Sequence, residues 1–291
     1  MPHLTRRGLT LVELIVALTL LGIISAGLYR VLVNNQRIYH AQTQRIDLQQ
    51  NIRAGATILP AEFRELDARD GDITAMTPTS ITIRAQRQLA FICALPVLGG
   101  GNATFVIRRT PFYGVRDFNA ATDSVFVYYE GDAATTVDDG WVIGAVTATP
   151  PPGVCSDGSA GRLLITAPTF APGPGVLQQF NQTGRIEDGA VIRGWTPVTY
   201  LLYTGTDGRQ YLGYQEAGTT SPLVGPLTAN GLTFAYYDST GAATAVPAQV
   251  AKIEIRLRAE TGAPIRQSDG TFNRLVDSVQ TWVSLRNNRR Y

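Results

Sequence analysis

The feature that most constrains this chain is a long apolar run close to its N-terminus. Residues 14–29 contain no charged side chain, and residues 9–29 contain only one, Glu13. A helix of this length is about 31 Å long, close to the thickness of the hydrocarbon core of a bilayer. Arg6 and Arg7 precede the run. This predicts a membrane-spanning helix with its N-terminus in the cytoplasm and the rest of the chain on the other side.

Glu13 bears on how the run is interpreted. A secretory signal peptide is one explanation, because Ser25, Ala26 and Gly27 offer small residues for cleavage after the apolar stretch. A simple membrane anchor is another explanation. A carboxylate in a membrane helix costs a few kcal/mol unless it snorkels to the surface or is paired, so by default it indicates a function.

Residues 8–14 read Gly-Leu-Thr-Leu-Val-Glu-Leu, with basic residues before them and the apolar run behind. This pattern resembles the class III leader junction of type IV prepilins and type II secretion pseudopilins. The resemblance implies that a membrane-embedded prepilin peptidase cleaves after Gly8 and methylates the new amino group of Leu9, where the family usually has Phe. It also implies that Glu13 forms an assembly salt bridge with the N-terminal amine of a neighbouring subunit. The alternative for Glu13 is a carboxylate held by the dipole of the first helical turn.

Beyond the apolar run the chain keeps a helical pattern but becomes polar. One apolar stripe continues at spacings of three and four residues, which predicts a helix face packed on a sheet; it consists of Leu48, Ile52, Ala56, Leu59, Phe63 and Leu66. Pro60 predicts a kink or a restart, and Asp70-Gly71-Asp72 predicts the stop. The expected organisation is a leader at 1–8, a transmembrane half of a helical spine at 9–33, a periplasmic half at 34–70 and a β-rich head at 71–291.

After residue 72 the sequence changes to short β-rich runs separated by Gly, Pro and Asp. Strict alternation over residues 251–258 predicts a strand with one buried and one wet face, as in an antiparallel sheet. Asp207-Gly208 predicts a hairpin. The expected fold class is α+β, a pilin-like spine on an antiparallel sheet. The predicted strands are 80–84, 89–94, 103–109, 124–129, 141–147, 162–166, 199–204, 209–215, 232–237, 248–258 and 277–285.

Residues 146–175 are rich in Gly, Pro and Ser and are expected to form a loop or a seam between two sub-sheets. Cys93 and Cys155 are the only cysteines. An exported head permits a disulfide between them, which would contribute about 4 kcal/mol in the chain-entropy model. Two buried free thiols are the alternative.

Composition argues against several function classes. The chain has 25 basic and 23 acidic residues and a formal charge of +2, so binding of nucleic acid through bulk charge is not expected. With two histidines and two cysteines, the residues for a His/Cys zinc site or a nucleophile–histidine pair are scarce. We therefore expect no enzyme activity, no metal and no cofactor.

The C-terminal part resembles a narrower group, the PilW minor pilins and J-type minor pseudopilins, through runs at 195–200, 223–224, 232–238, 250–257 and 283–287. The resemblance implies a minor type IV pilin that is inserted in the bacterial inner membrane with its head in the periplasm and then enters, or primes, a pilus. Its implied partners are major and minor pilins, prepilin peptidase, the inner-membrane assembly platform and the lipid bilayer. The alternatives are a minor pseudopilin of a type II secretion system, or a membrane-anchored adhesin or DNA-uptake module.

Overall fold

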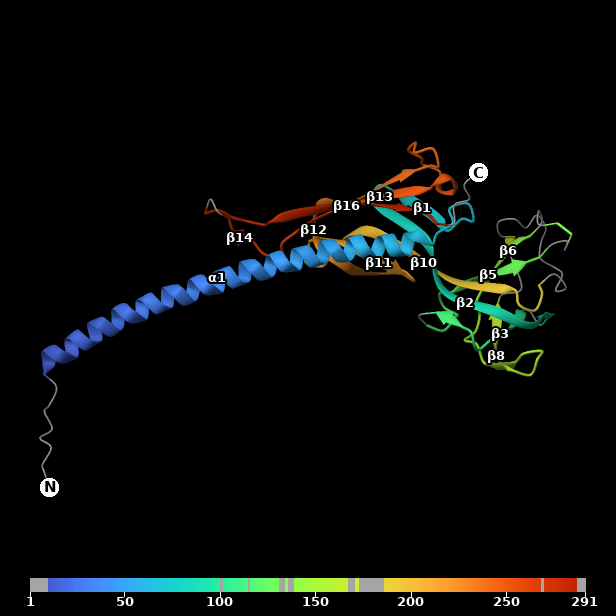
Figure 1. The fold of residues 1–291 in the computed structure, drawn as a ribbon, viewed down its shortest axis with the longest axis horizontal. Helices are drawn as coiled ribbons and strands as arrows, with labels where there is room; N and C mark the ends of the chain where they lie inside the picture. Colours follow the sequence, from blue (N-terminus) through green and yellow to red (C-terminus); the bar gives the residue numbers. More distant parts are fainter. Residues whose placement is uncertain are drawn as a thin grey trace, which may run out of the picture.

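The computed structural model describes residues 10–99, 102–114, 116–130, 134–135, 139–166, 171–172, 186–267 and 270–286. One long helix is followed by an extended β-structure. Figure 1 shows the helix as a gently curved rod whose N-terminal part stands free of the strands and whose C-terminal part lies against them. The predicted α+β fold, a helical spine on an antiparallel sheet, is confirmed.

The helix α1 (Leu11–Arg64) has 54 residues, and the predicted apolar stripe faces the sheet. Leu48, Ile52 and Phe63 are buried as expected. Ala56 is only half-buried, and Gly55 takes its place at the closest approach. A Cβ atom on Gly55 would lie 2.5 Å from Cδ1 of Leu257, so the absence of a side chain lets the helix come close to the strand behind it.

The C-terminal end of α1 differs from the expectation. The helix continues through Pro60 to Arg64, so a restart at Pro60 is wrong. Burial of apolar side chains on both sides of Pro60 offsets its cost of roughly 3 kcal/mol. The helix also stops before residues 70–72. The Asp67 carboxylate accepts hydrogen bonds from the backbone N–H of Arg69 (3.0 Å) and Asp70 (3.3 Å), which favours turns over a further helical turn.

The strands are joined by antiparallel pairings, and the main sheet runs in the order β16-β13-β12-β11-β10-β2-β3-β8-β7. A 3-10 turn, η2 (Pro247–Gln249), precedes β13. The bounds are β1 (Ile73–Thr77), β2 (Ser80–Gly99), β3 (Asn102–Arg108), β4 (Tyr113–Gly114), β5 (Ser124–Tyr129), β6 (Gly140–Ala145), β7 (Pro152–Val154), β8 (Ala160–Thr166), β9 (Ala171–Pro172), β10 (Val191–Thr204), β11 (Gln210–Glu216), β12 (Thr219–Tyr237), β13 (Lys252–Glu260), β14 (Ile265–Arg266), β15 (Phe272–Asn273) and β16 (Val276–Ser284).

Every strand predicted from the sequence overlaps an observed strand, and the Asp207-Gly208 turn joins β10 to β11. The differences are of two kinds. The runs at 80–84 and 89–94 fuse into β2, because pairing with β10 continues across the polar residues between them. Within residues 146–175, expected to be a loop or seam apart from the predicted strand at 162–166, the structure places β7 and β9 in addition to β8.

The buried apolar side chains of the described residues form two clusters. The proximal core joins the stripe of α1 to β10–β13 and β16. The distal core contains Phe105, Val127, Leu164 and Ile192 and no residue of α1. The long strands β2 and β10 supply side chains to both clusters. Figure 1 shows β3, β5, β6 and β8 gathered beyond the C-terminal end of α1.

The predicted alternation of β13 is confirmed on its inner face and wrong at one outer position. Ile253, Ile255 and Leu257 are buried toward the helix. Glu254, expected on the wet face, is 1% exposed. Neighbouring side chains on the outer face cover it and donate hydrogen bonds to it, including Tyr237 Oη at 2.9 Å and Gln280 Nε2 at 2.8 Å.

Candidate functional site

A capping box formed by Thr10 and Glu13 starts α1. The Glu13 N–H donates to Thr10 Oγ1 at 3.3 Å, and the Thr10 N–H donates to Glu13 Oε2 at 3.4 Å. Thr followed three residues later by Glu is the sequence pattern of this cap, so Thr10 could have been recognised beside Glu13. The carboxylate lies exposed at the helix start, where the helix dipole stabilises a negative charge.

The N-terminal half of α1 is apolar on all sides and does not pack against the head. An 18-residue window has a mean hydropathy of 2.4 and is 0% buried, so α1 is long and apolar enough to cross a membrane. Ile23, for example, is 70% exposed. A Cβ atom added at Gly22 or Gly27 would meet nothing within 4 Å. Within the described chain, this surface has no protein partner that would remove it from water.

The C-terminal half of α1 is tied to the head at three levels. Gln44 Oε1 accepts the N–H of Ala263 at 3.0 Å, and Asn51 Nδ2 donates to the carbonyl of Gly225 at 2.8 Å. The N–H of Arg286 donates to the carbonyl of Arg64 at 2.8 Å. These bonds add to the burial of the apolar stripe. A force or tilt applied to the helix is therefore passed to the sheet.

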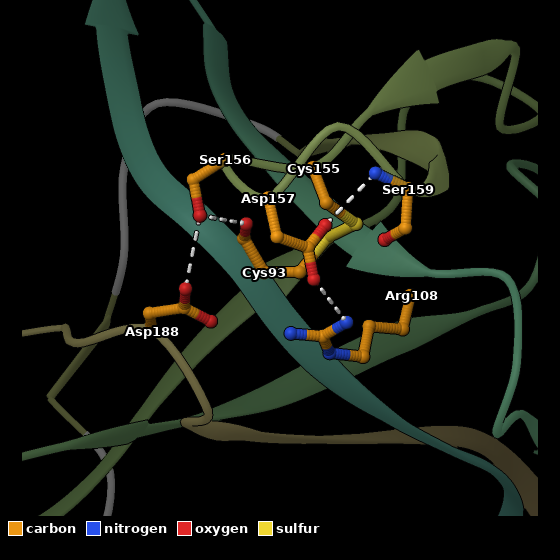
Figure 2. The surroundings of a disulfide bond; sticks show 7 residues. All are labelled: Cys93, Arg108, Cys155, Ser156, Asp157, Ser159 and Asp188. Atoms are coloured by element: carbon orange, nitrogen blue, oxygen red, sulfur yellow. Dashed lines mark hydrogen bonds and ion pairs between the residues drawn. A yellow bond between two sulfur atoms is a disulfide. The ribbon is translucent and has the colours of Figure 1, made fainter.

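Cys93 on β2 and Cys155, just after β7, are joined by a disulfide with a Cα–Cα distance of 5.0 Å (Figure 2). Ser156 Oγ donates to the Cys93 carbonyl at 2.9 Å and to Asp188 Oδ2 at 3.0 Å. Asp157 accepts from the Ser159 N–H and from Arg108. These bonds lower the pKa of Asp157, the Ser159 contacts most strongly. The disulfide and its neighbours fasten the β7–β8 turn to β2.

Asp123 forms a buried ionic network at the edge of the distal core. It accepts from Arg116 (2.6 and 2.7 Å), from Thr196 Oγ1 (2.8 Å) and from the Asn119 N–H (2.8 Å). Burial alone would raise the pKa of Asp123, but these donors outweigh it, and the pKa lies below its usual range. The carboxylate therefore stays ionised and joins β5, β10 and the loop before β5.

Asp72 lies between the two cores and behaves in the opposite way. Its side chain is fully buried, its Oδ2 accepts the Asp67 N–H at 2.9 Å and lies 3.8 Å from Arg193, and its Oδ1 has no hydrogen-bond partner. Burial raises the pKa of Asp72 to about 6. Two guanidiniums beside it stack on aromatic rings, Arg84 at 4.9 Å from the Trp195 ring and Arg193 at 5.2 Å from the Trp141 ring.

The described residues contain no group of three or more His, Cys, Asp or Glu side chains that could hold a metal ion. The site that the geometry defines is instead a surface. It consists of the capped helix start at Thr10 and Glu13 and the exposed apolar half of α1 behind it. Such a surface can contact lipid, or the equivalent surface of a similar helix.

Comparison with known families agrees with this geometry. Residues 4–29 match the family model described as the prokaryotic N-terminal methylation motif. The match spans Gly8, Leu9, Glu13 and the apolar run, and it confirms the resemblance to the N-terminus of type IV prepilins and pseudopilins. The chain thus carries the N-terminus of a type IV pilin-like or pseudopilin protein, a class that prepilin peptidase processes. No curated protein and no solved structure matches the chain.

The predicted site residues fall into three groups. Gly8 and Leu9 lie outside the described residues, so cleavage and methylation there stay predictions. Glu13 is placed in the first turn of α1, and its pairing with another subunit stays a prediction. Cys93 and Cys155 are bonded. The sequence interpretation did not find the roles of Thr10, Asp72 and Asp123. Asp72 and Asp123 each combine near partners with one distant partner, Arg193 and Thr196 respectively, which the sequence pattern does not reveal.

Proposed function

We propose that this protein is a minor type IV pilin of the PilW-like group, which enters a pilus or primes its assembly. One observation carries the proposal. A methylation motif leads directly into a helix whose apolar half is wholly exposed and whose other half is fixed to a large β-structure. An exposed apolar rod of this length needs a bilayer first and sister helices afterwards.

Cleavage of the leader prepares α1 for transfer from the bilayer to a bundle of sister helices. Hydrolysis of the peptide bond after Gly8 frees the amino group of Leu9, which stays cationic after methylation. It also removes Arg6 and Arg7, and with them the formal charge falls from +2 to 0, since the leader contains no acidic residue. Loss of the two arginines lowers the cost of drawing the N-terminus into an apolar bundle.

Glu13 gives the rod its register in the assembly. The two hydrogen bonds that its carboxylate accepts from Thr10 are long, both 3.4 Å, so the carboxylate keeps the capacity to accept a stronger, charge-assisted bond. The partner is the amine of Leu9 on a neighbouring subunit. A carboxylate is stable among apolar helices when such a cation neutralises it, and a shifted register would leave it unpaired.

Mass spectrometry of the mature N-terminus tests the processing step. We expect the chain to begin at Leu9 with a methylated amine. A Gly8→Val variant is expected to keep its leader, and a Gly22→Val variant, which changes a glycine in open surroundings, is the control. An N-terminus near residue 27 would indicate a signal peptide instead, and an intact Met1 in the host would contradict processing altogether.

Incorporation of Glu13 variants tests the pairing step. We expect Glu13→Ala to be inserted in the membrane but to enter filaments about tenfold less than the natural chain, because the partner amine is then left unpaired. Thr10→Ala is the matched control, since it removes the cap and keeps the carboxylate. Quantitative immunoblotting of sheared pili measures both. Normal incorporation of Glu13→Ala would refute the pairing role.

A further inference from the structure

Residues 262–267 and 270–275 extend the head toward the N-terminal half of α1. They contain the small hairpin of β14 and β15, in which Ile265 pairs with Asn273 and Arg266 pairs with Phe272. Figure 1 shows β14 projecting beyond the rest of the sheet, alongside α1 and toward its N-terminal half. Ile265 is buried, whereas Arg266 is exposed and Phe272 is 63% exposed. A large exposed aromatic beside a cation is typical of a contact surface.

The rise per residue of α1 gives an estimate of how far this hairpin lies from the membrane. The predicted transmembrane half of the helix ends at Val33, and Gln44, which accepts the N–H of Ala263, lies about 16 Å further along the helix axis. The Arg266–Phe272 pair lies beyond Ala263 in the direction of the membrane by about 10 Å of extended chain. The pair is therefore about 6 Å above the level of Val33. This is the depth of the headgroup layer, which is about 6 Å thick on each side of a bilayer.

The part of α1 near this level carries basic but no acidic side chains. From Leu14 to Ile46 the sequence contains no acidic residue, and it contains Arg30, Arg37 and Arg45. Arg37 is four residues beyond Val33, about 6 Å along the helix axis, so Arg266 on the hairpin adds a second cation at about the level of Arg37. The hairpin sequence contains one acidic residue, Asp269. An arginine at the bilayer surface attracts anionic headgroups by about 1 kcal/mol.

We propose that the β14–β15 hairpin docks on the anionic lipid surface of the bilayer that α1 crosses. Phe272 enters the interface and Arg266 binds lipid phosphate. The contact fixes the tilt and rotation of the head before the subunit leaves the membrane, and it is broken when the subunit enters a filament. This inference rests on the proposed function to the extent that α1 must span the bilayer.

Depth-dependent fluorescence quenching tests the inference on the full chain, reconstituted at about one protein per vesicle. Both native cysteines are in the disulfide, so a single added cysteine can be labelled. Asn273→Cys carries the probe next to Phe272 and keeps it. Val246→Cys is the matched control, since Val246 is 48% exposed and adjoins η2, which packs on β1 at the other end of the head. Leu21→Cys reports whether α1 spans the bilayer.

In vesicles of phosphatidylcholine with phosphatidylglycerol, we expect a headgroup nitroxide to quench the probe at position 273 and to leave the probe at 246 unquenched. Adding Arg266→Gln is expected to lower the ratio of docked to undocked states about fivefold, and Phe272→Ser should lower it as well. Equal quenching in phosphatidylcholine alone would overturn the role of anionic lipid.

Two negative results have different meanings. If the probe at position 21 is quenched by a deep nitroxide and the probe at 273 is not quenched by a shallow one, the hairpin does not dock and the proposed function stands. If the probe at 21 is not quenched by the deep nitroxide, α1 does not span the bilayer. That result overturns the membrane stage of the proposed function and this inference with it.

Discussion

The two halves of α1 form one continuous helix and yet depend on different partners. In the N-terminal half, apolar side chains occur on every side and an 18-residue window is 0% buried. In the C-terminal half, apolar side chains are confined to one stripe, and Leu59 and Phe63 are 0% exposed. A helix that is apolar all round requires an apolar phase around it, whereas a one-sided helix requires a single packing surface.

This difference separates two kinds of residue along the same rod. A side chain in the C-terminal half contributes to the stability of the head, because its partners are in the same chain. A side chain in the N-terminal half has no partner within the described chain. Under the proposed function it contributes to insertion or assembly instead. Substitutions in the two halves should therefore affect different measurements, and matched pairs of substitutions can test whether the division is as sharp as the structure indicates.

The largest expected contrast is between Phe63 and Leu21. The Phe63 ring packs edge-on against Tyr200 at 5.7 Å and Phe234 at 6.0 Å. We expect Phe63→Ala to lower the free energy of unfolding of the head by about 3–5 kcal/mol. Leu21→Ala, at a position 60% exposed, is expected to change it by less than about 0.5 kcal/mol. Urea unfolding of the full chain in detergent, followed by tryptophan fluorescence, measures both. Equal effects would contradict the division.

A second prediction concerns Asp72, in the turn that follows the head-bound half. Burial raises its pKa in the folded chain to about 6, above its usual value of 3.8. Its contribution to stability is therefore complete below about pH 4 and is lost as the pH rises through 6. The loss amounts to at most about 3 kcal/mol, at 1.36 kcal/mol per pKa unit.

Asp72→Asn keeps a neutral side chain at all pH values and should remove this loss. We expect the variant to gain stability relative to the natural chain between pH 4 and pH 7. Asp123, whose pKa is lowered, acts in the opposite direction and loses its contribution as the pH falls. Both chains contain Asp123, so its contribution cancels when the free energy of unfolding of the natural chain is subtracted from that of the variant. If the difference in free energy of unfolding between the two chains stays constant from pH 4 to pH 7, Asp72 does not titrate as its burial implies.

The smallest expected effect comes from two glycines of α1. Gly55→Val places a branched side chain where Cδ1 of Leu257 lies 2.5 Å from the added Cβ, and it should cost the head about 1–3 kcal/mol. Gly22→Val meets nothing within 4 Å and should leave the head unchanged. The same unfolding measurement checks the pair. A stable Gly55→Val variant would mean that the Leu257 side chain or the helix can shift at little cost.

Local patterns predicted much of this architecture. The apolar run, the stripe from Leu48 to Leu66 and the Asp207-Gly208 turn each have a period or a dipeptide that encodes a conformation directly. The structure departs from prediction where distant partners act. Glu254 is buried because Tyr237 and Gln280 cover it, and the polar middle of β2 is a strand because β10 pairs with it.

The sequence by itself determined the N-terminal half of α1 and the motif that precedes it. A methylation motif and an apolar run act through local composition, and neither needs a partner within the chain to be recognised. Only the tertiary structure decided how the β-strands divide into a core with α1 and a core without it, and that Asp72 lies between them. The division follows from long-range pairing of β2 with β10, whose partners are a hundred or more residues apart in the chain.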